Sequence, residues 1–253
     1  YLSEKDDANA LKYYLKILEI DPDNGFVLFS LTSFYRQKED KEKAWEYVRR
    51  GFLNKTADVE TKIQYYLMIM AEPEKPFFTD DQVDELVNIL VKTNADDYRV
   101  FTVYAEYLIS KGKLAEARDQ LRKVLETNKD NYMIWERMLM ISNDLLDFKG
   151  IYTDAEKALE LFPNQPLLYG LRAVACLQLE KYSEALDILN EGEPYLLDNK
   201  PMKIQFDLYR AEANYKLDRV EEAFKAFEAV IQLDPENWLA MNNYAYYLSL
   251  RNE

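Results

Sequence analysis

Histidine is absent from this chain of 253 residues, and cysteine occurs once, as Cys176. Zinc sites of the usual cysteine and histidine type are therefore excluded, and a single thiol cannot form a disulfide within the chain. Cys176 has no histidine to serve as its base, so the sequence does not support a cysteine nucleophile. Because it lies in the apolar stretch 173–177, we expect a buried structural thiol.

Glycine and proline are also scarce, with six and eight residues, and glycine-rich phosphate loops are missing. Few turn-forming residues together with abundant Leu, Ala, Glu, Lys and Tyr favour long helices over a turn-rich sheet, so we expect an all-α chain. The longest apolar run, 65–71, is much shorter than the roughly 20 residues of a membrane-spanning helix. No direct membrane span is expected in this sequence.

Positive charge is in deficit, since 32 Lys and Arg face 46 Asp and Glu for a net charge of -14. Nucleic acid is therefore an unfavourable partner, because binding its phosphates relies on Lys and Arg. A protein with basic patches, or one held by apolar contacts, fits better. The alternative is that the acidity only keeps a helical rod soluble. Carboxylate pairs arise by chance at this composition, so we predict no catalytic or metal site and no cofactor.

What the sequence does contain is an internal repeat with a period of about 34 residues, a length typical of paired-helix repeat families. Three stretches that each follow an apolar helical pattern lie in register at this spacing: 93–98, 127–132 and 161–166. Such a period indicates stacked helical units, which usually expose an extended surface for other proteins.

The ends of these helices can be placed from single residues. The apolar helical pattern of 221–233 stops before Pro235, and Asn24 and Asn237 are suited to cap the helices that follow them. Thr79 and Gln82 form a capping-box pattern, and Pro201 suits a first helical turn. Small residues recur where two helices would cross closely: Ala10, Ala44, Ala117, Ala185 and Ala223.

In these features the chain resembles the tetratricopeptide repeat (TPR) family, whose pattern W-x2-L-G-x2-Y…A-x3-F…P has the same period. The second helix of 204–237 matches best, and 132–165 carries the opening tryptophan as Trp135. The family's glycine in the first helix is replaced by Thr32, Ala105, Leu139, Ala173 and Ala211. The resemblance, which is strongest to bacterial multi-TPR proteins, implies an α-solenoid, a right-handed superhelix of antiparallel helix pairs.

We predict a single TPR-like solenoid over 1–253. Its units would cover 1–24 (partial), 25–58, 59–97, 98–131, 132–165, 166–203, 204–237 and 238–253 (partial). Two of them exceed the repeat period, through the insertions 72–78 and 191–200, where we expect altered stacking. Residues 1–3 are interpreted as the end of a first helix, and 238 to about 250 as another first helix. The chain is therefore expected to be a fragment of a longer protein, in which uncapped ends could also self-associate.

In this family the first helix of each pair lines a concave groove. An i, i+3, i+7, i+10 spacing predicts the groove residues, which are Phe26, Phe29, Ser33, Arg36, Arg99, Thr102, Glu106, Ile109, Glu136, Met140, Asn143, Leu208, Glu212 and Tyr215. They do not reproduce the Lys and Asn set with which some TPR proteins hold a C-terminal carboxylate. The alternative is a solvated face, with binding on the convex side or at the insertions.

The resemblance thus implies a non-enzymatic scaffold that binds a protein or peptide segment along an acidic and aromatic groove. The alternative is a regulatory or substrate-docking arm of an enzyme whose catalytic domain lies outside this fragment. By analogy with bacterial TPR proteins we lean toward the cell envelope, periplasmic or lipoprotein-anchored, with the cytoplasm as the alternative.

Overall fold

The computed structural model describes residues 4–72 and 76–250, and these form helices joined by short loops, with no strand among them. The expected end of a first helix at 1–3 lies outside the described residues. The chain divides into two compact units, 1–113 and 114–253.

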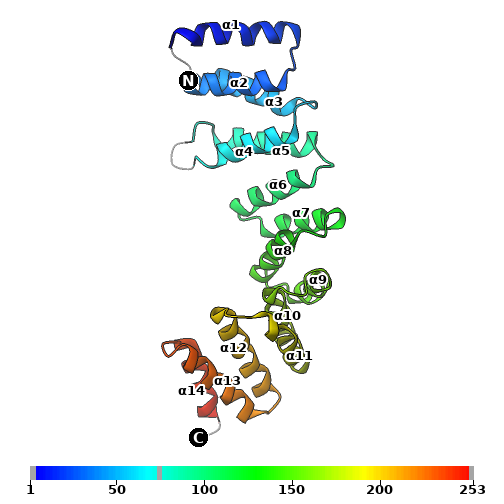
Figure 1. Ribbon diagram of the computed structural model, residues 1–253, viewed down its shortest axis with the longest axis vertical. Helices are drawn as coiled ribbons and strands as arrows, with labels where there is room; N and C mark the ends of the chain where they lie inside the picture. The colour runs from blue at the N-terminus through cyan, green and yellow to red at the C-terminus, as the bar shows by residue number, and fades with distance from the viewer. Residues whose placement is uncertain (1–3, 73–75, 251–253) are drawn as a thin grey trace. The chain divides into compact units, whose positions relative to one another are not determined.

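The first unit contains six helices in its described residues (Figure 1). They are α1 (Glu4–Ile20), α2 (Gly25–Gln37), α3 (Lys41–Leu53), α4 (Val59–Met70), α5 (Asp80–Thr93) and α6 (Tyr98–Ser110). The helices form two layers. In one layer α2 contacts α4 through the rings of Phe29 and Tyr65, and α4 contacts α6 through Glu60 and Arg99. In the other layer α3 packs against α5.

The second unit continues the same alternation (Figure 1). Its helices are α7 (Leu114–Thr127), α8 (Tyr132–Asp144), α9 (Phe148–Leu161), α10 (Pro166–Gln178), α11 (Tyr182–Gly192), α12 (Lys200–Lys216), α13 (Val220–Leu233) and α14 (Trp238–Leu250), with the 3-10 turn η1 (Glu193–Tyr195) after α11. Consecutive helices pack pairwise, and α10 also packs on α8 and α12. The all-α solenoid expected from the repeat is thus the observed fold.

Local sequence explains where several helices begin. The side chain of Asn24 accepts a hydrogen bond from the backbone N–H of Val27, and the side chain of Asn237 accepts one from the backbone N–H of Ala240. Thr79 and Gln82 make both bonds of the capping box, and Pro201 lies in the first turn of α12. These four expectations are confirmed, because caps are set by residues within one turn of the helix end.

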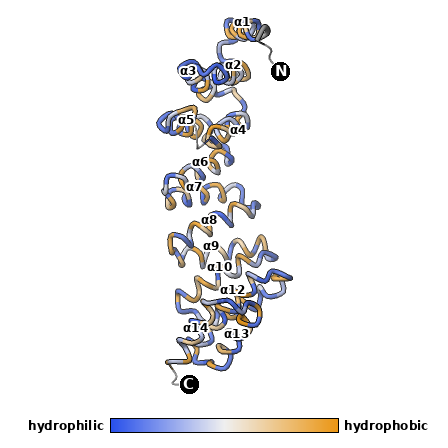
Figure 2. The backbone as a smooth tube through the Cα atoms, turned by 90° about the vertical axis from the view of Figure 1, so that its left-hand side faces the viewer, coloured by the Kyte–Doolittle hydropathy of each residue, from blue (hydrophilic) through white to orange (hydrophobic). Residues whose placement is uncertain are grey.

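Apolar side chains between the two layers form the core. Hydrophobic and hydrophilic residues alternate along the tube of the backbone in Figure 2. In the first unit Leu28, Val48, Phe52 and Leu86 are fully buried, and in the second unit Phe206 and Cys176 are. The expectation of a buried thiol is confirmed. The alanines at 44, 117, 185 and 223 also have no exposed surface, as close helix crossings require.

The described residues of both insertions contact neighbouring helices. Phe78 is 2% exposed and packs edge-on against Trp45 of α3, with ring centroids 6.0 Å apart. After η1, Leu196 is buried, and Tyr195 stacks on Tyr169 of α10 at 5.7 Å. The described residues of each insertion therefore add to the core of their own unit.

Candidate functional site

The two layers differ in the apolar surface that they expose. We define the first-helix face as the solvent-exposed side of α2, α4 and α6 in the first unit and of α8, α10, α12 and α14 in the second. Large exposed apolar side chains on these helices are Phe26, Leu67, Met68, Met70, Tyr98, Met133, Met140, Trp238, Leu239, Met241, Tyr246 and Leu250. On the second helices α3, α5, α7, α9, α11 and α13 they are limited to Leu53, Leu161 and Leu233, each the last residue of its helix. Helix α1, which takes the place of the second helix in the partial unit 1–24, is an exception, because it exposes Tyr13, Leu15, Ile17 and Ile20.

On α2 the predicted groove residues take different roles. Phe26 is 78% exposed, whereas Phe29 is 6% exposed and packs edge-on against Phe52 at 5.9 Å. Ser33 is exposed and lies 3.1 Å from the Tyr65 hydroxyl. Arg36 pairs with Glu72 at 2.5 Å, and its guanidinium lies over Phe77. Phe29 thus belongs to the core, and Arg36 attaches the first insertion to α2.

On α6 the predicted residues surround a short ion-pair chain. Arg99 pairs with Asp97 at 2.6 Å and with Glu60 of α4 at 3.0 Å. The Arg99 guanidinium, by hydrogen bonding, holds the pKa of Asp97 below its usual value. Thr102 and Ile109 are half-buried, and Glu106 is exposed. Arg99 therefore joins α4 to α6 at the start of this face.

Helix α4 also exposes apolar side chains on the first-helix face, although none of the predicted groove residues lies on it. Leu67 and Met70 are 49% and 37% exposed, and they lie on the helix between α2 and α6. The spacing used for the other helices also selects Glu60, Ile63, Leu67 and Met70 on this one, so the signal was present in the sequence.

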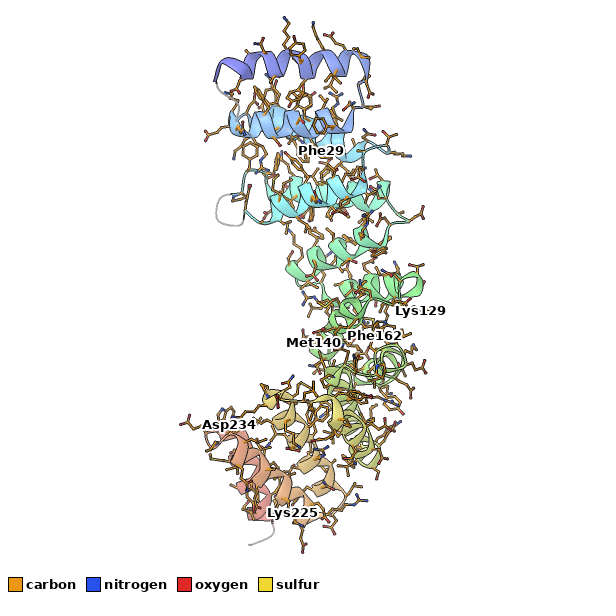
Figure 3. The ribbon with its side chains drawn as sticks, in the orientation of Figure 1. Phe29, Lys129, Met140, Phe162, Lys225 and Asp234 are labelled. Carbon is orange, nitrogen blue, oxygen red and sulfur yellow. The ribbon has the colours of Figure 1, made fainter. Side chains whose placement is uncertain are left out.

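On α8 the predicted residues lie at the surface of the second unit. Met140 is 40% exposed, while Glu136 and Asn143 are half-buried. Figure 3 shows Met140 on the side of α8 that faces away from Lys129, which follows α7. Burial, reinforced by the Glu136 carboxylate, raises the pKa of Tyr132 to about 12, so this phenol stays protonated.

On α12 the predicted residues Leu208, Glu212 and Tyr215 are all half-buried. The ring of Tyr215 lies against that of Tyr247 from α14, with centroids 3.9 Å apart. Burial raises the pKa of Glu212 above its usual value. The α12–α14 surface is therefore aromatic around one desolvated carboxylate.

Another hollow lies among α7, α8 and α9. It has a volume of about 530 Å³, and its lining includes Trp135, Met138, Arg122 and Asp154. Arg122 pairs with Asp154 at 3.0 Å, so an ion pair joins the second helices α7 and α9 at this hollow.

The single cysteine is not arranged as a nucleophile. Burial raises the pKa of the Cys176 thiol to about 11, which keeps it protonated and unreactive. Among residues 4–72 and 76–250, no three Asp, Glu or Cys side chains are grouped to hold a metal ion. Nor is any described helix long and apolar enough to cross a membrane.

Comparison with known proteins gives the same repeat. A family model described as tetratricopeptide repeat matches residues 1–24 and 210–237. The chain is 33% identical over 91 residues to the protein STIP1 homolog of Dictyostelium discoideum, a match over 36% of this chain and 15% of that protein.

Solved bacterial structures share the fold. The C-terminal part of a TPR repeat-containing protein from Cytophaga hutchinsonii superposes with a TM-score of 0.63 at 16% identity, covering 94% of each chain. A tetratricopeptide repeat protein from Parabacteroides merdae gives 0.62 at 16% identity, covering 77% of this chain and 73% of that one. These likenesses establish the fold of the chain.

Proposed function

We propose that this helical solenoid, which is similar to tetratricopeptide repeat proteins, is a non-enzymatic scaffold that binds a partner protein along its first-helix face. Stacked helix pairs present extended surfaces rather than deep catalytic pockets. One observation carries the choice of face, namely that from α2 to α14 the exposed large apolar side chains of the helices are concentrated on the first helices. Exposed apolar clusters rimmed by polar residues are typical of interaction sites.

The chemistry of this face supports binding of a peptide or helix by apolar anchors. In the first unit Leu67 and Met70 lie on α4, the helix that also carries Glu60 of the ion pair with Arg99. In the second unit Met140 is flanked on α8 by Glu136 and Asn143. Methionine side chains are flexible and polarisable, so they adapt to apolar residues of varied shape. The surrounding polar groups would fix orientation.

Matched substitutions on the two layers test this proposal. Leu67→Glu changes a leucine that is 49% exposed on α4, and Leu53→Glu changes one that is 44% exposed on α3. In the second unit Met140→Glu and Leu161→Glu form a similar pair at 40% and 39% exposure. Each pair introduces the same charge at nearly equal exposure, so the two members differ mainly in the layer that they occupy.

The measurement is quantitative affinity capture with the wild-type chain and each variant, after circular dichroism has verified folding. We expect Leu67→Glu or Met140→Glu to reduce recovery of partners at least about tenfold, because a buried interfacial charge costs more than 1.4 kcal/mol. Leu53→Glu and Leu161→Glu should recover them normally. Equal recovery by all four variants, or loss confined to the second-helix pair, would place binding elsewhere.

A further inference from the structure

A carboxylate surrounded by tyrosines lies on the first-helix face of the second unit. Glu212 is in the middle of α12, with Tyr209 one turn before it and Tyr215 one turn after it. Tyr247 reaches this surface from α14, where its ring contacts Tyr215 at 3.9 Å and Phe227 of α13 at 5.8 Å. Packing on two helices therefore fixes the aromatic surface beside Glu212.

Several half-buried or buried carboxylates of this unit are paired with a cation, whereas Glu212 is paired with none in the part of the chain that the structure describes. Asp154 pairs with Arg122, Asp207 with Lys203 and Arg210, and Glu193 with Arg210. Among the described residues none forms an ion pair or hydrogen bond with Glu212, and Lys216 acts on it only at longer range. A desolvated carboxylate without a cation is costly, because burial removes water and nothing replaces it.

The titration of the neighbouring groups agrees with this geometry. Burial raises the pKa values of Tyr209 and Tyr247, and the Glu212 charge is the next largest cause for both phenols. Both rings thus lie near enough to sense the carboxylate. Tyrosine faces attract cations, and the attraction grows where water is excluded.

From this arrangement we propose that Glu212, flanked by Tyr209, Tyr215 and Tyr247, receives a lysine or arginine side chain of the bound partner segment. The inference rests on the proposed function, because it assigns a chemistry to one part of the first-helix face. A cation would supply the missing counter-charge of Glu212, and its aliphatic stem would lie along the aromatic rings. The net charge of -14 favours a basic segment over an acidic one at the same place.

The test uses a random dodecapeptide library displayed on phage, selected against the full chain. Peptides that bind are synthesised and titrated against the wild type, Glu212→Gln and Glu228→Gln. Glu228 on α13 is the matched control, because it also lies beside a tyrosine. It differs from Glu212 in being exposed and in accepting a hydrogen bond from the Tyr244 hydroxyl at 3.1 Å. Removing the Glu212 charge relieves its desolvation, so the test variant is expected to fold.

We expect the selected peptides to share a lysine or arginine. Glu212→Gln should weaken their binding about tenfold or more, because hydrogen bonds to charged groups have this strength. Replacing that peptide residue by glutamine should weaken binding to the wild type equally, but cause no further loss with Glu212→Gln. Glu228→Gln should bind as the wild type does.

Two results would overturn the inference. Peptides that lose binding to Met140→Glu or Tyr246→Glu but bind Glu212→Gln normally would leave the first-helix face in place and remove the basic-residue site. Selected peptides that share no basic residue would also remove the basic-residue site. Peptides insensitive to all of these substitutions would contradict the proposed function itself.

Discussion

At the scale of single residues, the least expected finding is a lysine at a core position. Lys62 stands at the place in its repeat that Leu28, Trp135 and Tyr169 hold in other repeats, and like them it is buried. Its Nζ donates to the Asn94 side-chain oxygen at 3.3 Å, and no carboxylate is paired with it among the described residues. Burial lowers the pKa of this lysine below its usual value, because its charge has lost water without gaining a counter-ion.

Lys62→Met should therefore raise the stability of the first unit by about 1 to 2 kcal/mol at neutral pH. A lowered lysine pKa means that the folded state binds fewer protons, so the wild type regains stability as the pH rises toward 10.5. The advantage of the variant should shrink over the same range. Urea denaturation of both proteins at pH 7 and pH 10 measures this difference in the free energy of unfolding. A variant less stable than the wild type at pH 7 would mean that the charge is compensated.

Glu212 gives the opposite dependence on pH. Its pKa is raised mainly by burial, so the folded state binds more protons than the unfolded state above pH 4.5. The wild type should lose stability as the pH rises from that value. Glu212→Gln should lack this loss and be more stable at pH 7, as thermal unfolding followed between pH 4 and pH 7 would show. Parallel curves for the two proteins would contradict the desolvation of Glu212.

At the scale of elements, close approach between helices decides where a repeat can lengthen. Gly192, within the second insertion, is the last residue of α11, and a Cβ built there would meet Tyr169 of α10 at 2.7 Å and Phe206 of α12 at 3.0 Å. A Cβ built at Gly170 of α10 would meet only Met202 at 3.3 Å and Phe206 at 3.4 Å. The glycine at 192 thus allows three helices to meet at the insertion.

Gly192→Ala should destabilise the second unit by about 1 to 3 kcal/mol, because the new methyl group overlaps a side chain held close to the backbone. Gly170→Ala is the matched control. Its neighbour is the flexible end of a methionine, so the helix propensity of alanine should make it neutral or up to about 1 kcal/mol stabilising. Melting temperatures of the two variants provide the comparison. Similar melting temperatures for the two variants would mean that Tyr169 can move away from a methyl group at position 192 at little cost.

At the scale of the whole molecule, stacked helix pairs contact mainly their neighbours along the chain. Stability in such arrays is approximately a sum of local terms. The first unit has its own buried cluster around Phe52, and the second unit has one around Phe206. Damage to one cluster should therefore remain local.

Phe52→Ala and Phe206→Ala test this, each at a typical cost of about 3 to 5 kcal/mol for a buried phenylalanine. We expect Phe52→Ala to speed amide hydrogen exchange in α2 to α5 and to leave α10 to α13 protected, and Phe206→Ala to do the reverse. Hydrogen exchange read by mass spectrometry resolves these segments. Loss of protection throughout the chain in either variant would show a single cooperative unit.

The sequence by itself determined the helical repeat and many of its helix ends. The repeat period, the caps at Asn24, Thr79 and Asn237, and the burial of Cys176 all follow from residue patterns that can be read along the chain. Such features are local, since a cap or an amphipathic stripe depends on neighbours within one or two turns.

Only the tertiary structure decided which predicted groove residues have exposed side chains. Phe29 and Met140 satisfy the same spacing, yet Phe29 packs between Phe52 and Tyr65 while Met140 is exposed. The isolation of Glu212 and the burial of Lys62 likewise depend on partners supplied by other helices. Spacing fixes the side of a helix, but the depth of a side chain and its counter-charges depend on contacts between helices distant in sequence.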